Sequence, residues 1–191
     1  MKPLSPFEYE HWEPTQTDTV PVGAKPVWLD DPLLKATYSP RQIQEYWGDP
    51  LAKLTPEQAG RAKKALADDG GNMMKLRAAG MKVVMGTDTG QTRFFIGYYN
   101  HMVLESYVAM GMTPMETIIA STRDSAAIAK VNSGVVAPNR QADFVVLDAN
   151  PLENIANTRK ISTVYLRGAE VPRAQLAGKW QSQFRRTASA Q

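Results

Sequence analysis

The clearest hydrophobic pattern is a short apolar run that ends in a polar turn. Met81, Val83, Val84 and Met85 lead into Gly86-Thr87-Asp88. A brief apolar run before a glycine-containing break is typical of a buried strand. We therefore predict a strand over 81–86, with a carboxylate at its carboxyl end.

Helical patterns lie on both sides of this strand. Thr55-Pro56 with Gln58 forms a capping-box sequence that opens a helix toward Ala79, weakened or bent at Gly70-Gly71 and stopped by Gly80. A second helix is predicted over 98–110, ending at Gly111, with Val103, Tyr107 and Met110 at helical spacing. Thr113, Pro114 and Glu116 open a third over 114–130, with Met115, Ile118, Ile119, Ala126 and Ala129 on its buried side. This order of elements indicates an α/β protein.

The periodicity changes near residue 133. Phe144-Val145-Val146-Leu147 is the strongest strand pattern, and 161–172 predicts a hairpin that turns at Gly168-Ala169. We divide the chain into an irregular lead-in (1–54), a helical unit with its strand (55–132), a small β unit (133–175) and a polar tail (176–191). The prolines of the lead-in leave room for a short strand at 25–29 and a short helix at 40–47.

Composition excludes several classes of protein. The 191 residues are 43% hydrophobic, carry a net charge of +3 and include no cysteine, so thiolate metal sites and disulfides are excluded. The basic residues are scattered rather than gathered in the stripe that nucleic-acid binding requires. No apolar run is long enough to span a membrane, and the N-terminus lacks the apolar centre of a signal peptide. The sequence is compatible with either a reducing or an oxidising cellular compartment.

Asp88 has three interpretations from these residues alone. A carboxylate at the end of a buried strand can bind a divalent metal or act as a base. More often, such an aspartate bonds backbone amides in a turn. A phosphate loop is disfavoured, because "GTDTGQT" lacks the lysine and the glycine spacing of known phosphate-binding motifs.

Other polar candidates are weaker. His101, near the start of a predicted helix, could reach a site formed by Asp88, although a cap or packed surface histidine is the more common case. His11 lies in irregular chain. The pairs Asp30-Asp31 and Asp68-Asp69 are expected to be solvated turns. A self-contained zinc site needs three or four protein ligands, which this pattern does not supply.

Three motifs in order resemble one known family: "AAGMKVVMGTDTG", "LESYVAMGMTPMETIIASTRDSAAIAK" and "SGVVAPNRQADFVVLDANPLENIANTRKISTVYLRGAEVPR". Over roughly 70–173 the chain resembles the C-terminal part of the amidohydrolase superfamily, closest to its imidazolonepropionase-like and Xaa-Pro-dipeptidase-like branch. The resemblance implies the last part of a (β/α)8 barrel, followed by a small β-sandwich-type unit. It also implies that Asp88 is the last-strand aspartate, which binds the metal or takes a proton from metal-bound water.

The resemblance has limits that shape the functional hypothesis. The family's His-x-His motif, its metal-bridging Lys or Glu and its two later histidines are not found in residues 1–80, so the chain is expected to begin after the sixth barrel strand. Family members use divalent metal, most often zinc, to hydrolyse small amides, dipeptides or cyclic amides. We expect this chain alone to hold metal weakly and to be inactive, and to associate with the missing barrel half or with itself. The alternatives are a non-catalytic binding or regulatory module and a hydrolase with a site rebuilt around Asp88.

Overall fold

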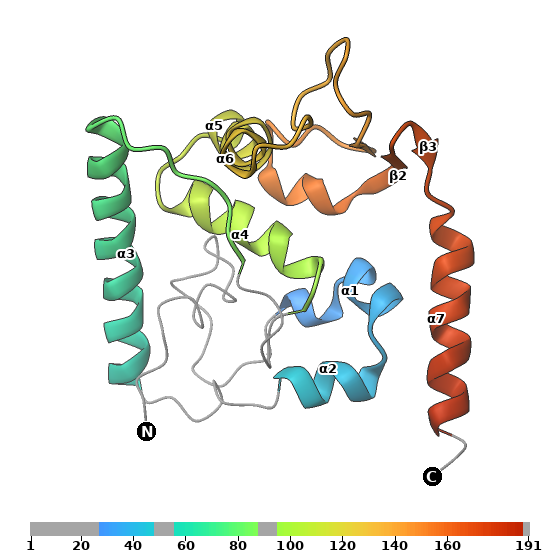
Figure 1. Ribbon diagram of the computed structural model, residues 1–191. Helices are drawn as coiled ribbons and strands as arrows, with labels where there is room; N and C mark the ends of the chain where they lie inside the picture. The colour runs from blue at the N-terminus through green and yellow to red at the C-terminus, as the bar shows by residue number, and fades with distance from the viewer. Residues whose placement is uncertain (1–26, 48–55, 88–94, 189–191) are drawn as a thin grey trace.

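The computed structural model describes residues 27–47, 56–87 and 95–188. Its elements in chain order are η2 (Val27–Asp30), α1 (Pro32–Thr37), α2 (Pro40–Trp47), α3 (Pro56–Ala78), α4 (Tyr98–Ala109), α5 (Pro114–Ile119), η4 (Ala120–Asp124), α6 (Ser125–Ala129), β1 (Phe144–Leu147), η5 (Ile155–Arg159), β2 (Ile161–Leu166), β3 (Ala169–Glu170) and α7 (Arg173–Ala188). The described chain is thus a mixture of helix and sheet (Figure 1).

The core forms where α4 packs on η2 and α1. Leu29 and Leu34 from the lead-in form one buried cluster with Tyr99 and Val103 of α4 and with Phe95 just before α4. Figure 1 shows α4 running through the middle of the molecule above α1, with α3 and α7 at opposite sides. Part of the lead-in is therefore core, which its proline-rich sequence did not indicate.

Local sequence signals place several elements where they were predicted. Helix α2 spans the predicted residues, and α4 ends at Ala109, two residues before Gly111, whose φ is 111°. The Thr113 hydroxyl accepts from the Glu116 N–H while the Glu116 carboxylate accepts from the Thr113 N–H, which confirms the capping box at the start of α5. The helix continues through the π-helical turn η4 into α6, and Lys130 caps it at φ 56°. On its predicted buried side, Ala126 is buried whereas Met115 and Ala129 are exposed.

Helix α3 is continuous through the two glycines that were predicted to weaken or bend it. The reason for Gly70 is close packing: a Cβ added there would lie 3.1 Å from the Cβ of Met110, beyond the end of α4. Gly80, at φ 89°, follows the helix and ends it as predicted, since the N–H of Met81 bonds the carbonyl of Leu76 across the terminus.

The sheet is antiparallel in the order β1-β2-β3. Phe144 pairs with Tyr165, and their rings stack with centroids 4.6 Å apart. The β2–β3 turn is centred on Arg167-Gly168, both at positive φ, one residue earlier than predicted. The polar tail, to which the sequence assigned no element, provides most of α7.

Two predicted strands do not form. Residues 27–29 of the first, 25–29, belong to the 3-10 helix η2, while 25–26 lie outside the described residues. Residues 81–87 carry no regular secondary structure. A strand exists through its ladder of hydrogen bonds to a neighbour. No strand in the described parts of the chain lies beside 81–87, so this apolar segment is held by side chains instead.

Candidate functional site

The segment that leads to Asp88 is fixed on both sides by hydroxyl groups. The Tyr107 hydroxyl of α4 donates to the carbonyl of Val84 at 2.8 Å. The N–H of Met85 donates to Ser125 Oγ at 3.2 Å. Asp88 itself lies outside the described residues, but the chain that carries it is anchored between α4 and α6.

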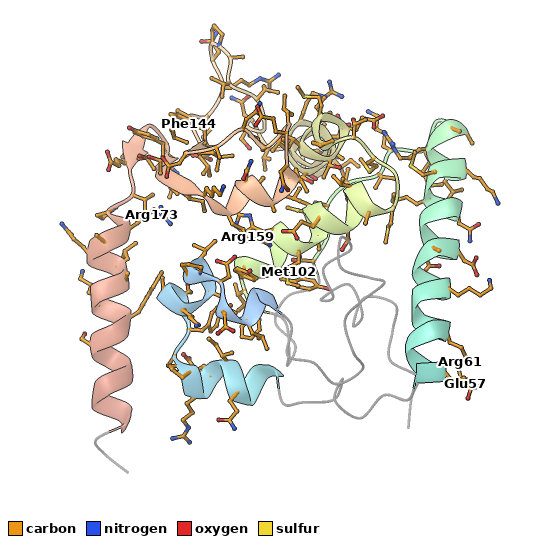
Figure 2. The ribbon with its side chains drawn as sticks, turned by 180° about the vertical axis from the view of Figure 1, so that it is seen from behind. Glu57, Arg61, Met102, Phe144, Arg159 and Arg173 are labelled. Atoms are coloured by element: carbon orange, nitrogen blue, oxygen red, sulfur yellow. The ribbon has the colours of Figure 1, made fainter. Side chains whose placement is uncertain are left out.

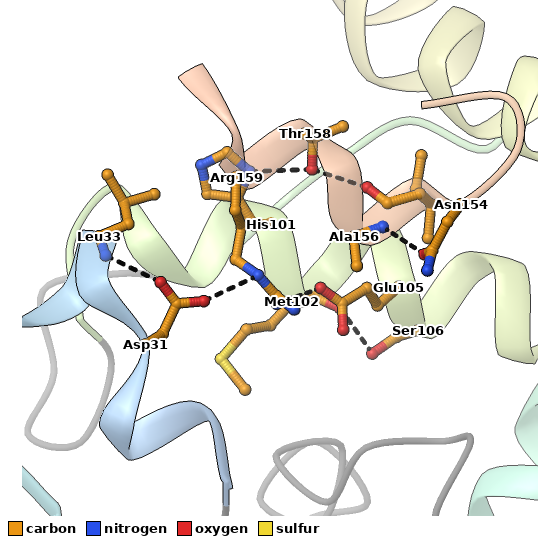
Figure 3. A network of polar contacts seen from close by, with 11 residues as sticks. Asp31, Leu33, His101, Met102, Glu105, Ser106, Asn154, Ala156, Thr158 and Arg159 are labelled. Atoms are coloured by element: carbon orange, nitrogen blue, oxygen red, sulfur yellow. Dashed lines mark hydrogen bonds and ion pairs between the residues drawn. The ribbon is translucent and has the colours of Figure 1, made fainter. Parts of the chain in front are cut away.

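His101 belongs to a different part of α4. Its Nδ1 lies 3.0 Å from Thr158 Oγ1, and the Thr158 hydroxyl itself donates to the carbonyl of Ile155 at 2.9 Å (Figure 3). Because a hydroxyl has one proton, Thr158 Oγ1 accepts from Nδ1–H. This arrangement selects the neutral Nδ1–H tautomer and leaves the Nε2 of His101 as an acceptor.

The surroundings of His101 keep it uncharged at neutral pH. Burial lowers its pKa to about 4, and the charge of Arg159 lowers it further than Asp31 raises it. His101 and Tyr107 are six residues apart, which places them roughly 120° apart around a helix with 3.6 residues per turn. Helix α4 therefore turns His101 toward η5 and Tyr107 toward Val84, so the structure does not bring His101 to the anchored segment.

A largely buried ion-pair network joins three parts of the chain that are distant in sequence. The Nε of Arg159 lies 3.1 Å from Asp31 Oδ2, and its Nη1 donates to Glu105 Oε1. The three side chains are only 14–17% exposed. Arg159 also lies over the ring of Tyr98, 5.9 Å from its centroid, and burial raises the pKa of that phenol. Figure 3 shows the network linking α1, α4 and η5.

The sequence did not predict this network, and the prediction for one of its two acidic members, Asp31, was wrong. Asp31 is not a solvated turn residue, because it caps α1 by accepting from the Leu33 N–H at 2.8 Å and pairs with Arg159. The local signal for the cap was present, since an aspartate before proline is a helix-start pattern. Asp68 and Asp69 are exposed as expected, but on α3 rather than in a turn.

The described side chains do not fit a metal ion by themselves. Over residues 27–47, 56–87 and 95–188, no group of three or more His, Asp or Glu side chains is placed to hold one. Asp31 and Glu105 both pair with the single guanidinium of Arg159. The network is a structural ion pair between packed elements.

A sequence model of the amidohydrolase family matches residues 50–171. This match covers most of the chain, including the anchored segment, Asp88 and His101. The chain belongs to the amidohydrolase family. The resemblance drawn from the three sequence motifs is thereby confirmed.

Solved structures agree with this assignment. A candidate prolidase from Bifidobacterium longum is 27% identical with a TM-score of 0.54, and the match covers 74% of this chain and 34% of that one. Phenylurea hydrolase B is 28% identical with a TM-score of 0.51, over 72% of this chain and 32% of that one. This amidohydrolase chain therefore spans about a third of the length of the solved proteins it matches. No curated protein sequence matches it.

The described helices include none that is long and apolar enough to cross a lipid bilayer.

Proposed function

We propose that this chain supplies the C-terminal part of the catalytic unit of a metal-dependent amidohydrolase, with Asp88 as its contributed carboxylate. The observation that carries this proposal is the family match over 50–171, which includes Asp88 and the segment before it. In this arrangement residues 81–86 take the place of the last barrel strand when neighbouring strands are present. Residues 133–175 take the place of the small β-sandwich-type unit.

The anchoring of 81–87 supports a defined role for Asp88. Tyr107 and Ser125 fix the backbone at Val84 and Met85, a few residues before the carboxylate. A carboxylate needs such support to be held within hydrogen-bond reach of the group from which it takes a proton. Asp88 is therefore proposed as a metal ligand or proton acceptor.

The substrate class follows from the family and its solved members. Amidohydrolases with a bound divalent metal, zinc above all, use it to activate water against a carbonyl carbon bonded to nitrogen. The named neighbours are a candidate prolidase and a phenylurea hydrolase. We propose an amide, dipeptide or cyclic amide substrate, with hydrolysis of its C–N bond.

The proposal includes a requirement for other polypeptide. One carboxylate is fewer than the three protein ligands of a catalytic zinc site, and the described residues contain no cluster of three metal-ligating side chains. We therefore propose that the chain alone binds zinc weakly and is inactive. A polypeptide carrying the histidine ligands of the family would complete the site, and could also cover the apolar side chains that remain exposed.

The test is hydrolysis of Xaa-Pro dipeptides and of a cyclic amide by the purified chain, alone and mixed with the polypeptide encoded immediately upstream. We expect turnover only in the mixture, abolished by Asp88→Asn. Asp148→Asn is the control, since Asp148 is an exposed aspartate that directly follows strand β1. Turnover by the chain alone, or full activity of Asp88→Asn in the mixture, would contradict the proposal.

A second candidate is a non-catalytic module that retains the amidohydrolase scaffold. The observation in its favour is that Asp31 and Glu105 both pair with Arg159, so these carboxylates hold packed elements together. Equilibrium dialysis separates the two. A mixture that binds no zinc and hydrolyses no amide would favour the module.

A further inference from the structure

A cleft of about 510 Å³ lies at the beginning of the anchored segment. Its walls come from the C-terminal turn of α3, from residues 80–83, and from α5 with η4. Figure 1 shows these elements meeting at one corner of the molecule, where α3 ends. The lining includes neither Tyr107 nor Ser125, the two residues that fix the backbone at Val84 and Met85. Its volume falls in the range of small-molecule sites.

Three methionines contribute to the apolar part of the cleft, beside Val83 and Ile119. Met74 comes from α3, Met81 from the anchored segment and Met112 from the turn before α5. Methionine side chains are flexible and polarizable, so walls of this kind adapt to an apolar ligand of varied shape. The cleft is thus suited to a hydrocarbon or aromatic body.

The carboxylates of the cleft are already engaged. Glu116 Oε1 accepts from Arg77 at 3.0 Å, and its Oε2 accepts from the N–H and hydroxyl of Thr113. These bonds, from Thr113 first, lower the pKa of Glu116 to about 2. Asp124 Oδ1 accepts from Arg123 at 2.8 Å. The acidic side chains therefore offer little to a cationic ligand.

Lys82 differs from the two arginines of the cleft. Each arginine bonds a carboxylate, whereas the ammonium of Lys82 has no hydrogen-bond partner among the described residues. Its charge contributes to the lowered pKa of Asp124, after the larger effect of the bond from Arg123. Arg77, Arg123 and Lys82 carry three positive charges, and Glu116 and Asp124 carry two negative charges. The cleft therefore has a net charge of +1, and Lys82 is the cation that bonds neither carboxylate.

The π-helical turn is a second observation at this place. Ala120, Arg123 and Asp124 of η4 line the cleft. The turn is fixed by Ser125, whose hydroxyl donates to the Ala120 carbonyl at 2.8 Å and accepts from the Met85 N–H. Single π-helical turns inside α-helices occur frequently at functional sites, because they re-aim the side chains of one turn.

We propose that this cleft binds a small carboxylate with an apolar body, with the carboxylate on Lys82 and the body against Met74, Met81 and Met112. The carboxylate accepts hydrogen bonds from the Lys82 ammonium, and the apolar body packs on the thioether groups of the three methionines. The ligand is a monoanion, since the cleft carries a single excess positive charge.

The test uses 4-phenylbutyrate and its neutral analogue 4-phenylbutyramide, titrated into the intact 191-residue chain by calorimetry. We expect the carboxylate to bind about tenfold more tightly than the amide, as befits one charge-assisted contact. Lys82→Met should remove this preference and leave amide binding unchanged. Lys160→Met, which changes an exposed lysine outside the cleft, should keep it.

A second variant tests whether the ligand binds in this cleft, independently of the charge of Lys82. Ala78 is an exposed cleft residue at the end of α3, so Ala78→Trp fills the cleft without disturbing the core. It should abolish binding of both compounds, while circular dichroism shows the fold retained. Equal binding of acid and amide, unchanged acid affinity in Lys82→Met, or unchanged binding in Ala78→Trp would each overturn the proposal. So would absence of binding at millimolar concentration.

Discussion

The Nε of Arg159 lies 3.1 Å from Oδ2 of Asp31, and this contact connects the lead-in to the β unit. Arg159 ends η5, directly before β2, and Asp31 caps α1. The same guanidinium bonds Glu105 of α4. One side chain thus holds together three elements that are distant in sequence.

Arg159→Met should lower the free energy of unfolding by about 3 kcal/mol, because it leaves the half-buried carboxylates of Asp31 and Glu105 uncompensated. Urea denaturation at pH 7 measures this change. The control is Arg61→Met, since Arg61 bonds Glu57 at 3.0 Å on the exposed surface of α3 (Figure 2). That substitution should change stability by less than about 0.5 kcal/mol. Equal losses in the two variants would show that the network does not stabilise the fold.

His101 should make stability depend on pH. Its pKa is about 4 in the folded chain and near 6.5 when unfolded, so between these values the unfolded chain binds a proton that the folded chain does not. The free energy of unfolding should therefore fall as pH falls from 6.5 toward 4, by at most about 1.4 kcal/mol per pH unit. Above pH 7, His101 should contribute nothing to the pH dependence.

Urea midpoints at pH 5, 6 and 7 check this slope. His101→Gln should flatten it, whereas His11→Gln, which changes the other histidine of the chain, should retain it. A slope that is the same in the original chain and in His101→Gln would contradict the assigned cause.

Short-range signals account for what the sequence predicted well. The capping box at Thr113 and Glu116, the stop at Gly111 and the apolar run of β1 each act within a few residues. Their effect is complete within one turn of helix or one strand. For that reason they could be located to within about one residue.

Long-range contacts account for the structural features that the sequence did not predict. The pattern of 81–86 is that of a strand, but a strand also needs neighbours, and those of the described chain lie elsewhere. Asp31 and Arg159 meet only after α1, α4 and η5 pack together. The role proposed for Asp88 rests on family membership, since nothing local distinguishes it from a turn aspartate.

Ser125→Ala should destabilise the chain by about 1 to 2 kcal/mol, because it removes the group that bonds both the Ala120 carbonyl and the Met85 N–H. Hydrogen exchange at the Met85 amide should accelerate at the same time. Ser182→Ala is the control: the Ser182 hydroxyl bonds the Lys179 carbonyl on the exposed surface of α7. Its loss should change stability by less than about 0.5 kcal/mol. Unchanged exchange at Met85 in Ser125→Ala would refute the anchoring role.

At Gly134 the β unit passes close to the helix before it. Its φ is 85°, and a Cβ there would lie 2.6 Å from the Thr122 carbonyl oxygen and 2.7 Å from the Ala126 Cβ. Gly134→Ala should therefore cost about 3 kcal/mol, since it combines a left-handed backbone with a clash against fixed backbone.

Gly80→Ala separates the two causes. Gly80 has a similar φ of 89°, but no heavy atom lies within 4 Å of its virtual Cβ. It should cost only about 1 to 2 kcal/mol, the strain of the left-handed conformation alone. The difference between the two variants, measured by urea denaturation, is the energy of the close approach between Gly134 and the turn at Thr122. Equal costs would mean that the β unit can move away from the helix, and that its packing there is loose.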